Sequence, residues 1–124
     1  MSIGIVDVSH VNVTVPPEME AAAKQFYSEL MGLEQVPKPE GPRQFIGAWY
    51  QIGATQLHLS IENDPQNLAS NRHVCYYVED LQVAMERLRG AGFEIIHERE
   101  DTKESLRFFV RDPGGNMIEI AQSR

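Results

Sequence analysis

Hydrophobic and polar residues alternate along residues 8–15, where Val11, Val13 and Val15 share one parity and His10 the other. Because successive side chains of a strand point to opposite faces, this alternation predicts a half-buried strand. Two prolines then end the strand. Apolar residues at helical spacing predict a helix over residues 18–31.

The rest of the first half reads as further strands. A proline-rich link over residues 37–42 predicts a loop with at most a short edge strand. Strands are expected over residues 44–52 and 55–61, joined by a tight turn at Gly53 and Ala54. In the second of these strands His58 lies on the face opposite Leu57 and Leu59.

The second half repeats this series. We expect a strand over residues 72–78, a helix over residues 80–89 capped by Asp80, and strands over residues 93–99, 106–111 and 115–121. His10 aligns with His73 in this repeat, and the Leu-His-Leu triplet around His58 aligns with the Ile-Glu-Ile triplet around Glu119. The chain therefore consists of two βαβββ units.

The predicted fold class is α+β. Two βαβββ units, over about residues 5–62 and 71–122, would form curved mixed sheets around a cavity, with the helices outside. The length of 124 residues fits one domain spanning residues 1–124.

Composition and charge narrow the function. The net charge of −7 argues against nucleic acid or an anionic membrane as a partner, and no apolar run has the length of a membrane helix. The N-terminus lacks the pattern of a signal peptide, so we expect a cytoplasmic protein. The single cysteine, Cys75, excludes an intrachain disulfide. A small-molecule ligand is the expected partner.

Four residues with metal-ligand chemistry occupy matching places in the two units. His10 and His73 lie in first strands, His58 and Glu119 lie in last strands, and all four lie opposite the aliphatic face. Imidazole nitrogen and carboxylate oxygen bind zinc, nickel, iron, cobalt or manganese, so these four residues predict a divalent metal site. The alternative is that each is an ordinary polar residue on a solvated face.

Other residues are secondary candidates. Cys75 and Tyr77 share the face of His73 and could line the cavity, whereas His97 fits a surface role. Two further sets of residues could touch a substrate: Phe45, Trp49 and Gln51 in one strand, and Arg107, Phe109 and Arg111 in another. The alternative is that the aromatic residues belong to the core and that the arginines are solvated.

Several segments together resemble the vicinal oxygen chelate superfamily, which includes glyoxalase I, bleomycin-resistance proteins, extradiol dioxygenases, fosfomycin-resistance transferases and methylmalonyl-CoA epimerase. The segments are residues 10–15, 26–33, 56–59, 72–74, 80–92 and 107–119, the last being the most specific. The resemblance implies a metal bound by residues of both units, and a homodimer in which units of two chains pair. Members that resemble glyoxalase I usually hold glutamate at the place of His58.

The resemblance implies a metal-dependent, glyoxalase-like lyase or isomerase that acts on a small substrate chelating the metal through adjacent oxygens. Glu119 would be the catalytic proton carrier. With three neutral histidines and one carboxylate a divalent ion keeps one positive charge, which favours an anionic oxygen. Two alternatives remain: an extradiol-type dioxygenase that uses ferrous iron, and a non-catalytic protein that sequesters a small molecule, as bleomycin-resistance proteins do.

Overall fold

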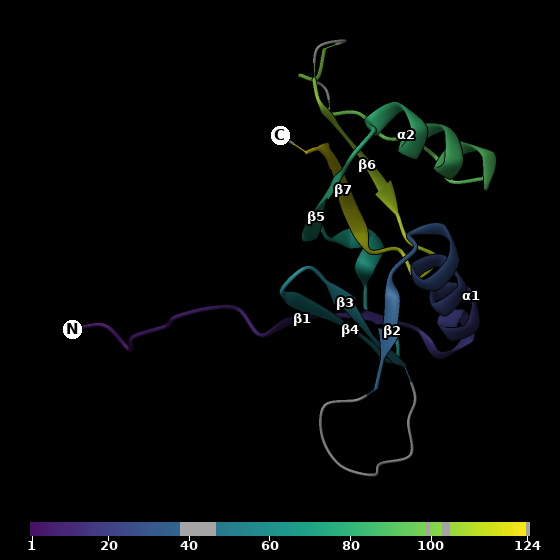
Figure 1. The fold of residues 1–124 in the computed structure, drawn as a ribbon. Helices are drawn as coiled ribbons and strands as arrows, with labels where there is room; N and C mark the ends of the chain where they lie inside the picture. Colours follow the sequence, from purple (N-terminus) through teal and green to yellow (C-terminus); the bar gives the residue numbers. More distant parts are fainter. Residues whose placement is uncertain (38–46, 99, 103–104, 124) are drawn as a thin grey trace. The chain divides into compact units, whose positions relative to one another are not determined.

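In the computed structural model, which describes residues 1–37, 47–98, 100–102 and 105–123, the chain divides into two units, Met1–Asn63 and Asp64–Arg124. Each unit contains one sheet and one main helical segment (Figure 1). None of the described helices has the length and apolarity needed to cross a membrane.

The sheet of the first unit is mixed, as predicted. Its strands lie in the order β1-β4-β3-β2. β4 pairs parallel with β1 and antiparallel with β3, and β3 pairs antiparallel with the short edge strand β2. The bounds are β1 (His10–Val15), β2 (Glu34–Val36), β3 (Ala48–Ile52) and β4 (Thr55–Ile61).

The predicted first helix is a continuous helical segment of three geometries. A 3₁₀ turn, η1 (Pro17–Met19), leads into α1 (Glu20–Gln25), which continues as a π-helical turn, η2 (Phe26–Leu30). Gly32 has a φ of +70° and follows the segment, in agreement with the helix end predicted at residue 31. The apolar stripe of the helix and the inward side chains of the sheet form one buried core: Val15, Ala23, Phe26, Tyr27, Tyr50, Leu57 and Leu59.

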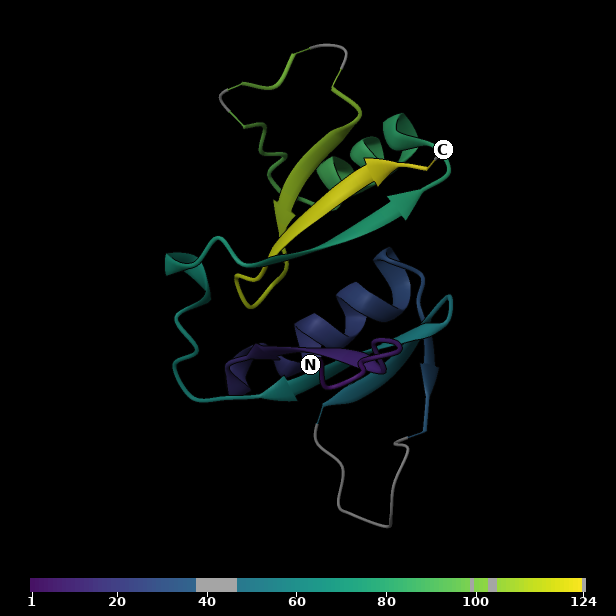
Figure 2. The same ribbon diagram turned by 90° about the vertical axis from the view of Figure 1, so that its left-hand side faces the viewer.

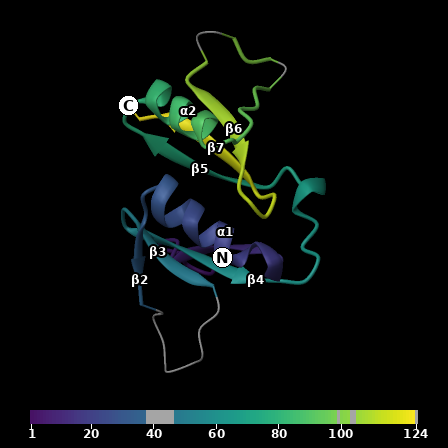
Figure 3. The ribbon, with the colours of Figure 1, turned by 90° about the vertical axis from the view of Figure 1, so that its right-hand side faces the viewer.

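The second unit has a three-stranded sheet in the order β5-β7-β6 (Figure 2). β7 pairs parallel with β5 and antiparallel with β6. A long helix, α2, lies along one face of this sheet (Figure 3). Asp80 caps α2, because its carboxylate accepts from the Val83 N–H at 3.1 Å. The bounds are η3 (Asn67–Ala69), β5 (His73–Val78), α2 (Leu81–Gly90), β6 (Arg107–Arg111) and β7 (Met117–Gln122).

The prediction of a strand over residues 93–99 is wrong for the part that the structure describes. Only Ile96 bridges to Phe109. The chain turns soon afterwards, because the Asp101 carboxylate accepts from the Glu98 N–H at 3.0 Å and thereby favours a turn over a continued ladder. Residue 99 and the first residues of the expected strand at 44–52, including Phe45, lie outside the described residues.

The internal repeat extends to the strand register. In the first unit Asn12 of β1 lies opposite His58 of β4, and in the second Cys75 of β5 lies opposite Glu119 of β7. His10 and His73 each stand two residues before these positions. In each unit the candidate ligand on the first strand therefore lies diagonally across a parallel strand pair from the candidate ligand on the last strand, and the offset is the same in both units.

Candidate metal centre

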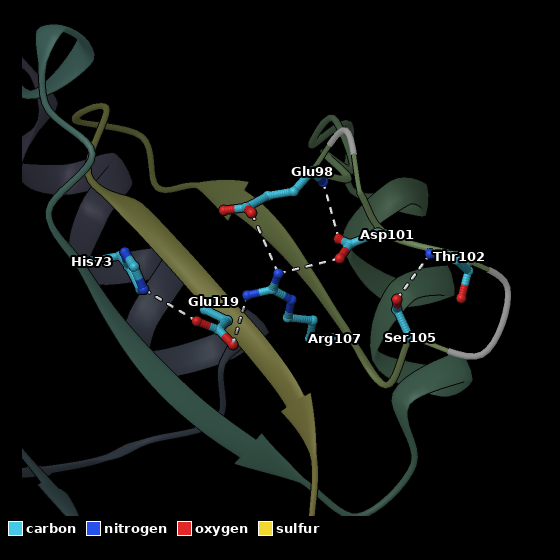
Figure 4. A network of polar contacts seen from close by, with 7 residues as sticks. All are labelled: His73, Glu98, Asp101, Thr102, Ser105, Arg107 and Glu119. Atoms are coloured by element: carbon cyan, nitrogen blue, oxygen red, sulfur yellow. Dashed lines mark hydrogen bonds and ion pairs between the residues drawn. The ribbon is translucent and has the colours of Figure 1, made fainter.

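The second unit brings His73 and Glu119 together (Figure 4). His73 Nε2 lies 3.1 Å from Glu119 Oε1, with 38% and 16% of the two side chains exposed. Two atoms bound to one ion by bonds of about 2.0–2.2 Å lie roughly 3 Å apart. The spacing of this nitrogen and oxygen therefore fits two ligands of a single divalent ion.

The protonation pattern of His73 also fits a cation. His73 Nδ1 lies 2.9 Å from the carbonyl oxygen of Asn71, which can only accept a hydrogen bond, so Nδ1 carries a proton. If the ring is neutral, Nε2 then has a lone pair, and this lone pair faces a carboxylate oxygen. Such a contact is favourable when a second proton or a metal ion lies between the two acceptors.

Arg107 of β6 lies near the other oxygen of Glu119. Arg107 Nη1 lies 3.8 Å from Glu119 Oε2, and Arg107 Nη2 lies 3.3 Å from Glu98 and 3.2 Å from Asp101 (Figure 4). The Glu98 N–H and then the Arg107 guanidinium hold the pKa of Asp101 below its usual range. Three carboxylates therefore face one guanidinium, and the surplus of negative charge favours a further cation.

Cys75 lies beside the same carboxylate. Partial burial, and then the negative charge of Glu119, raise the pKa of the Cys75 thiol. The sequence predicts Cys75 on the face of His73, and the residue is exposed there. A raised pKa keeps the sulfur protonated at neutral pH, so that it is a weak nucleophile.

The first unit gathers His10 and His58 around Trp49. The His58 ring stacks on the Trp49 ring with centroids 4.2 Å apart and planes 7° from parallel. The His10 ring meets Trp49 edge-on at 4.9 Å, and the two imidazole centroids lie 6.4 Å apart. Asn12 anchors the strand pair beneath them, because its amide donates to the His58 carbonyl and to Ser60 Oγ, each at 2.9 Å.

Trp49 and Phe109 are counterparts in the repeat. Trp49 lies opposite His58 in the β3–β4 register, and Phe109 lies opposite Glu119 in the β6–β7 register. Phe109 contacts His73 edge-on at 5.4 Å, as Trp49 contacts His10. Each candidate ligand pair is therefore accompanied by one buried aromatic ring on the same face of the sheet.

The four predicted ligands thus form two pairs, one in each unit. Across the ranges that the structure describes, no group of three or more His, Cys, Asp or Glu side chains is placed to hold a metal ion. The donor chemistry of each pair fits a divalent ion, and a site that unites all four residues stays a prediction.

Arg107 is the residue whose role the sequence pattern missed. A solvated arginine was its simpler interpretation, yet it contacts Glu119. Its parity with Phe109 in β6 was the available signal, because that parity places it on the face of Glu119. Arg111, on the same face, instead donates to the carbonyl oxygens of Asn67 and Gly115 and so holds a loop.

An open groove of about 750 Å³ lies within the second unit. Its lining includes His97, which was expected at the surface, together with Asp101 and Arg107. None of the four candidate ligands lines it. Arg107 therefore connects this groove with the Glu119 carboxylate.

Comparison with known proteins agrees with this arrangement. The family model of the Glyoxalase/Bleomycin resistance protein/Dioxygenase superfamily matches residues 8–120. The chain belongs to this superfamily. The matched residues include all four candidate ligands, and the vicinal oxygen chelate fold of the superfamily agrees with the repeated units described above.

Individual relatives differ in their activities. The chain is 28% identical to an ethylmalonyl-CoA/methylmalonyl-CoA epimerase of Cereibacter sphaeroides, over 93% of this chain and 96% of the relative. It is 32% identical to a protein of Bacillus anthracis assigned to the glyoxalase family, with full coverage of both chains and a TM-score of 0.81. Superfamily membership therefore fixes the fold while leaving the reaction to be argued from the site.

A third relative contains a metal. A mutant of the fosfomycin resistance protein FosX of Listeria monocytogenes, complexed with Mn(II) and dihydroxypropylphosphonic acid, is 14% identical over 98% of this chain and 95% of that chain, with a TM-score of 0.79. At this identity the likeness shows the fold alone.

Proposed function

We propose that this protein is a metal-dependent enzyme of the glyoxalase type, a lyase or isomerase that moves a proton next to a carbonyl group of a small substrate. The ligands would be His10, His58, His73 and Glu119, and the substrate would chelate the ion through adjacent oxygens. The observation that carries the proposal is the contact of His73 with Glu119, in which an imidazole nitrogen and a carboxylate oxygen lie 3.1 Å apart, the spacing of two ligands of one ion.

The relatives support the choice of reaction class. The relative of Cereibacter sphaeroides is named an ethylmalonyl-CoA/methylmalonyl-CoA epimerase. Inversion at a carbon next to a carbonyl group needs removal and return of a proton, which is the chemistry proposed here. FosX was crystallised with a divalent ion, which supports a divalent metal here. The homodimer and the small-molecule substrate belong to the same proposal.

A bound divalent ion would polarise the substrate carbonyl and so acidify the neighbouring C–H group. Glu119 would accept that proton, while the electron pair of the C–H bond forms a carbon–carbon double bond and the π pair of the carbonyl group moves onto its oxygen. Return of the proton to the other side of the carbon, or to an adjacent carbon, completes an isomerisation. His73 would orient the Glu119 carboxylate through its contact at 3.1 Å, and the Arg107 guanidinium, 3.8 Å from the other oxygen, adds a positive charge nearby.

The test has two stages. Metal analysis of protein purified without added metal should find close to one divalent ion per chain. The loaded protein should then catalyse exchange of solvent deuterium into 2-alkylmalonyl-CoA thioesters or lactoylglutathione, and E119Q should abolish the exchange. Protein that binds no metal contradicts the proposal, and so does E119Q with undiminished exchange.

The same assays separate the alternatives. Oxygen uptake on catechols by the ferrous protein would replace the isomerase with an extradiol-type dioxygenase. Tight ligand binding that survives removal of all metal would indicate a sequestering protein, in line with the antibiotic-binding protein TnmS3 of Streptomyces, to which the chain is 23% identical.

A further inference from the structure

We propose that Trp49 is a positioning residue, whose ring holds the imidazoles of His10 and His58 in the orientation that metal binding requires. This inference rests on the proposed metal site. It extends that site to a residue that provides no ligand atom.

The ring contacts define the positions of both histidines. His58 lies flat on the indole, with 7° between the planes, and His10 meets the indole at 62°. An imidazole binds an ion along its nitrogen lone pair, which lies in the plane of the ring. Fixing the two ring planes therefore fixes the directions along which His10 and His58 can bind.

Trp49 is not a member of the core that α1 covers. Its neighbours in β3, Ala48 and Tyr50, are fully buried, and Tyr50 contacts Ser28 and Tyr27 of the helical segment. Alternation along β3 places Trp49 on the opposite face, where the histidines lie. Trp49 is nevertheless only 7% exposed. On this face the indole ring contacts both imidazoles.

The indole nitrogen does not account for the placement of Trp49. Its N–H is buried and has no hydrogen-bond partner among the residues that the structure describes. The ring faces and edges therefore carry the contacts that hold the residue. A phenyl ring, which keeps a flat aromatic face but has no N–H, should substitute for most of this role.

Phe109 supplies independent support from the second unit. It occupies the same register position and meets His73 edge-on at 5.4 Å. In that unit a hydrogen bond to the Asn71 carbonyl also orients the histidine, as second-shell partners of metal-binding histidines commonly do. His58 has the stacked indole against its ring face, a contact that restrains the ring plane.

The test is calorimetric titration of metal-free protein with Zn²⁺. W49L should bind about 10–100-fold more weakly than wild type, the usual cost of losing a residue that orients a ligand. W49F should stay within about threefold of wild type. The control Y50F removes a hydroxyl from the opposite face of β3 and should leave the affinity unchanged. Circular dichroism of each variant confirms that the unit is folded.

A second measurement uses the wild-type chain, which contains one tryptophan. Co²⁺ quenches tryptophan fluorescence at short range, so stoichiometric Co²⁺ should quench Trp49 strongly and EDTA should restore the emission. Wild-type binding without quenching, or full Zn²⁺ affinity in W49L, overturns the positioning role but leaves the proposed function intact. Wild-type protein that binds neither ion overturns both.

Discussion

The two units place similar side chains by the same backbone plan and hold them by different forces. In the first unit an indole ring packs against two imidazoles. In the second unit a carboxylate is held by His73 and Arg107, with Glu98 and Asp101 behind the guanidinium. A repeated strand register therefore fixes where the candidate ligands stand, and the two pairs differ in charge because one contains a carboxylate and the other does not.

One pair of counterparts explains much of this difference. Two residues before Trp49 the chain has Gly47, and two residues before Phe109 it has Arg107. Gly47 donates its N–H to Glu20 at 2.9 Å, and a side chain there would collide with β4. The first unit consequently has no guanidinium at the position that corresponds to Arg107. Its candidate pair of two histidines also contains no carboxylate.

The largest predicted effect separates the two pairs by charge. E119Q removes the one negative ligand, so it should weaken Zn²⁺ binding by more than the roughly 100-fold that loss of an outer-shell partner costs. H58E restores a carboxylate in the first unit and should bind at least as tightly as wild type, since a second negative charge faces the ion. Calorimetric titration measures both variants. Equal losses of Zn²⁺ affinity in E119Q and H58E would contradict the claim that negative charge on the ligands strengthens binding.

The next prediction concerns the effect on stability of a side chain at Gly47, the counterpart of Arg107. A Cβ on Gly47 would lie 2.1 Å from the Leu59 carbonyl oxygen, and Gly47 has a φ of +89°. G47A should therefore lower the free energy of unfolding by roughly 2–5 kcal/mol, measured by urea denaturation. Gly53, with a φ of +54° and open space around its Cβ position, is the control, and G53A should cost about 1 kcal/mol. Similar losses in both variants would contradict the steric explanation.

The strand connections provide a smaller contrast. The β6–β7 turn is organised by buried Asp112, which accepts from the Gly114 and Asn116 N–H groups at 2.9 and 2.8 Å. D112A should cost about 2–4 kcal/mol of unfolding free energy, because it leaves these donors without their charged acceptor. In the β3–β4 turn Gln51 donates to the Gly53 carbonyl, and Q51A should cost below about 1 kcal/mol. The difference between the two variants is the quantity to measure.

The sequence alone predicted the features that depend on periodicity. Alternation in β1 and β4 placed His10 and His58 on one face, and the repeat predicted that β5 and β7 are the counterparts of β1 and β4. The Asp80 cap and the helix end at Gly32 were also predictable, because capping is local.

Contacts made by long side chains were not predictable in this way. Arg107 can reach Glu119, Glu98 or solvent from the same backbone position, and the sequence does not determine which it selects. The expected strand over residues 93–99 was lost to a competing turn at Asp101, whose side chain binds a nearby N–H. Periodicity determines the face on which a residue lies, and packing determines its partner there.

The smallest predicted effect concerns the pH dependence of stability in the second unit. The pKa of Asp101 is held low, first by the Glu98 N–H and then by Arg107. The stabilisation is therefore present above the unfolded aspartate pKa of about 3.9 and is lost as pH falls through the lower folded value. NMR titration should show a partial rise of the Asp101 pKa in R107Q, because the N–H donor remains. An unchanged pKa would show that Arg107 does not interact with Asp101.

The central claim is the proposal that one divalent ion is bound by two residues of the first unit and two of the second. These are His10 and His58, and His73 and Glu119. X-ray absorption spectroscopy of Co²⁺-loaded protein counts the imidazoles on the metal. We predict three imidazoles in wild type, falling to two in H10Q and to two in H73Q. A count that does not change in one of these variants would contradict a shared site.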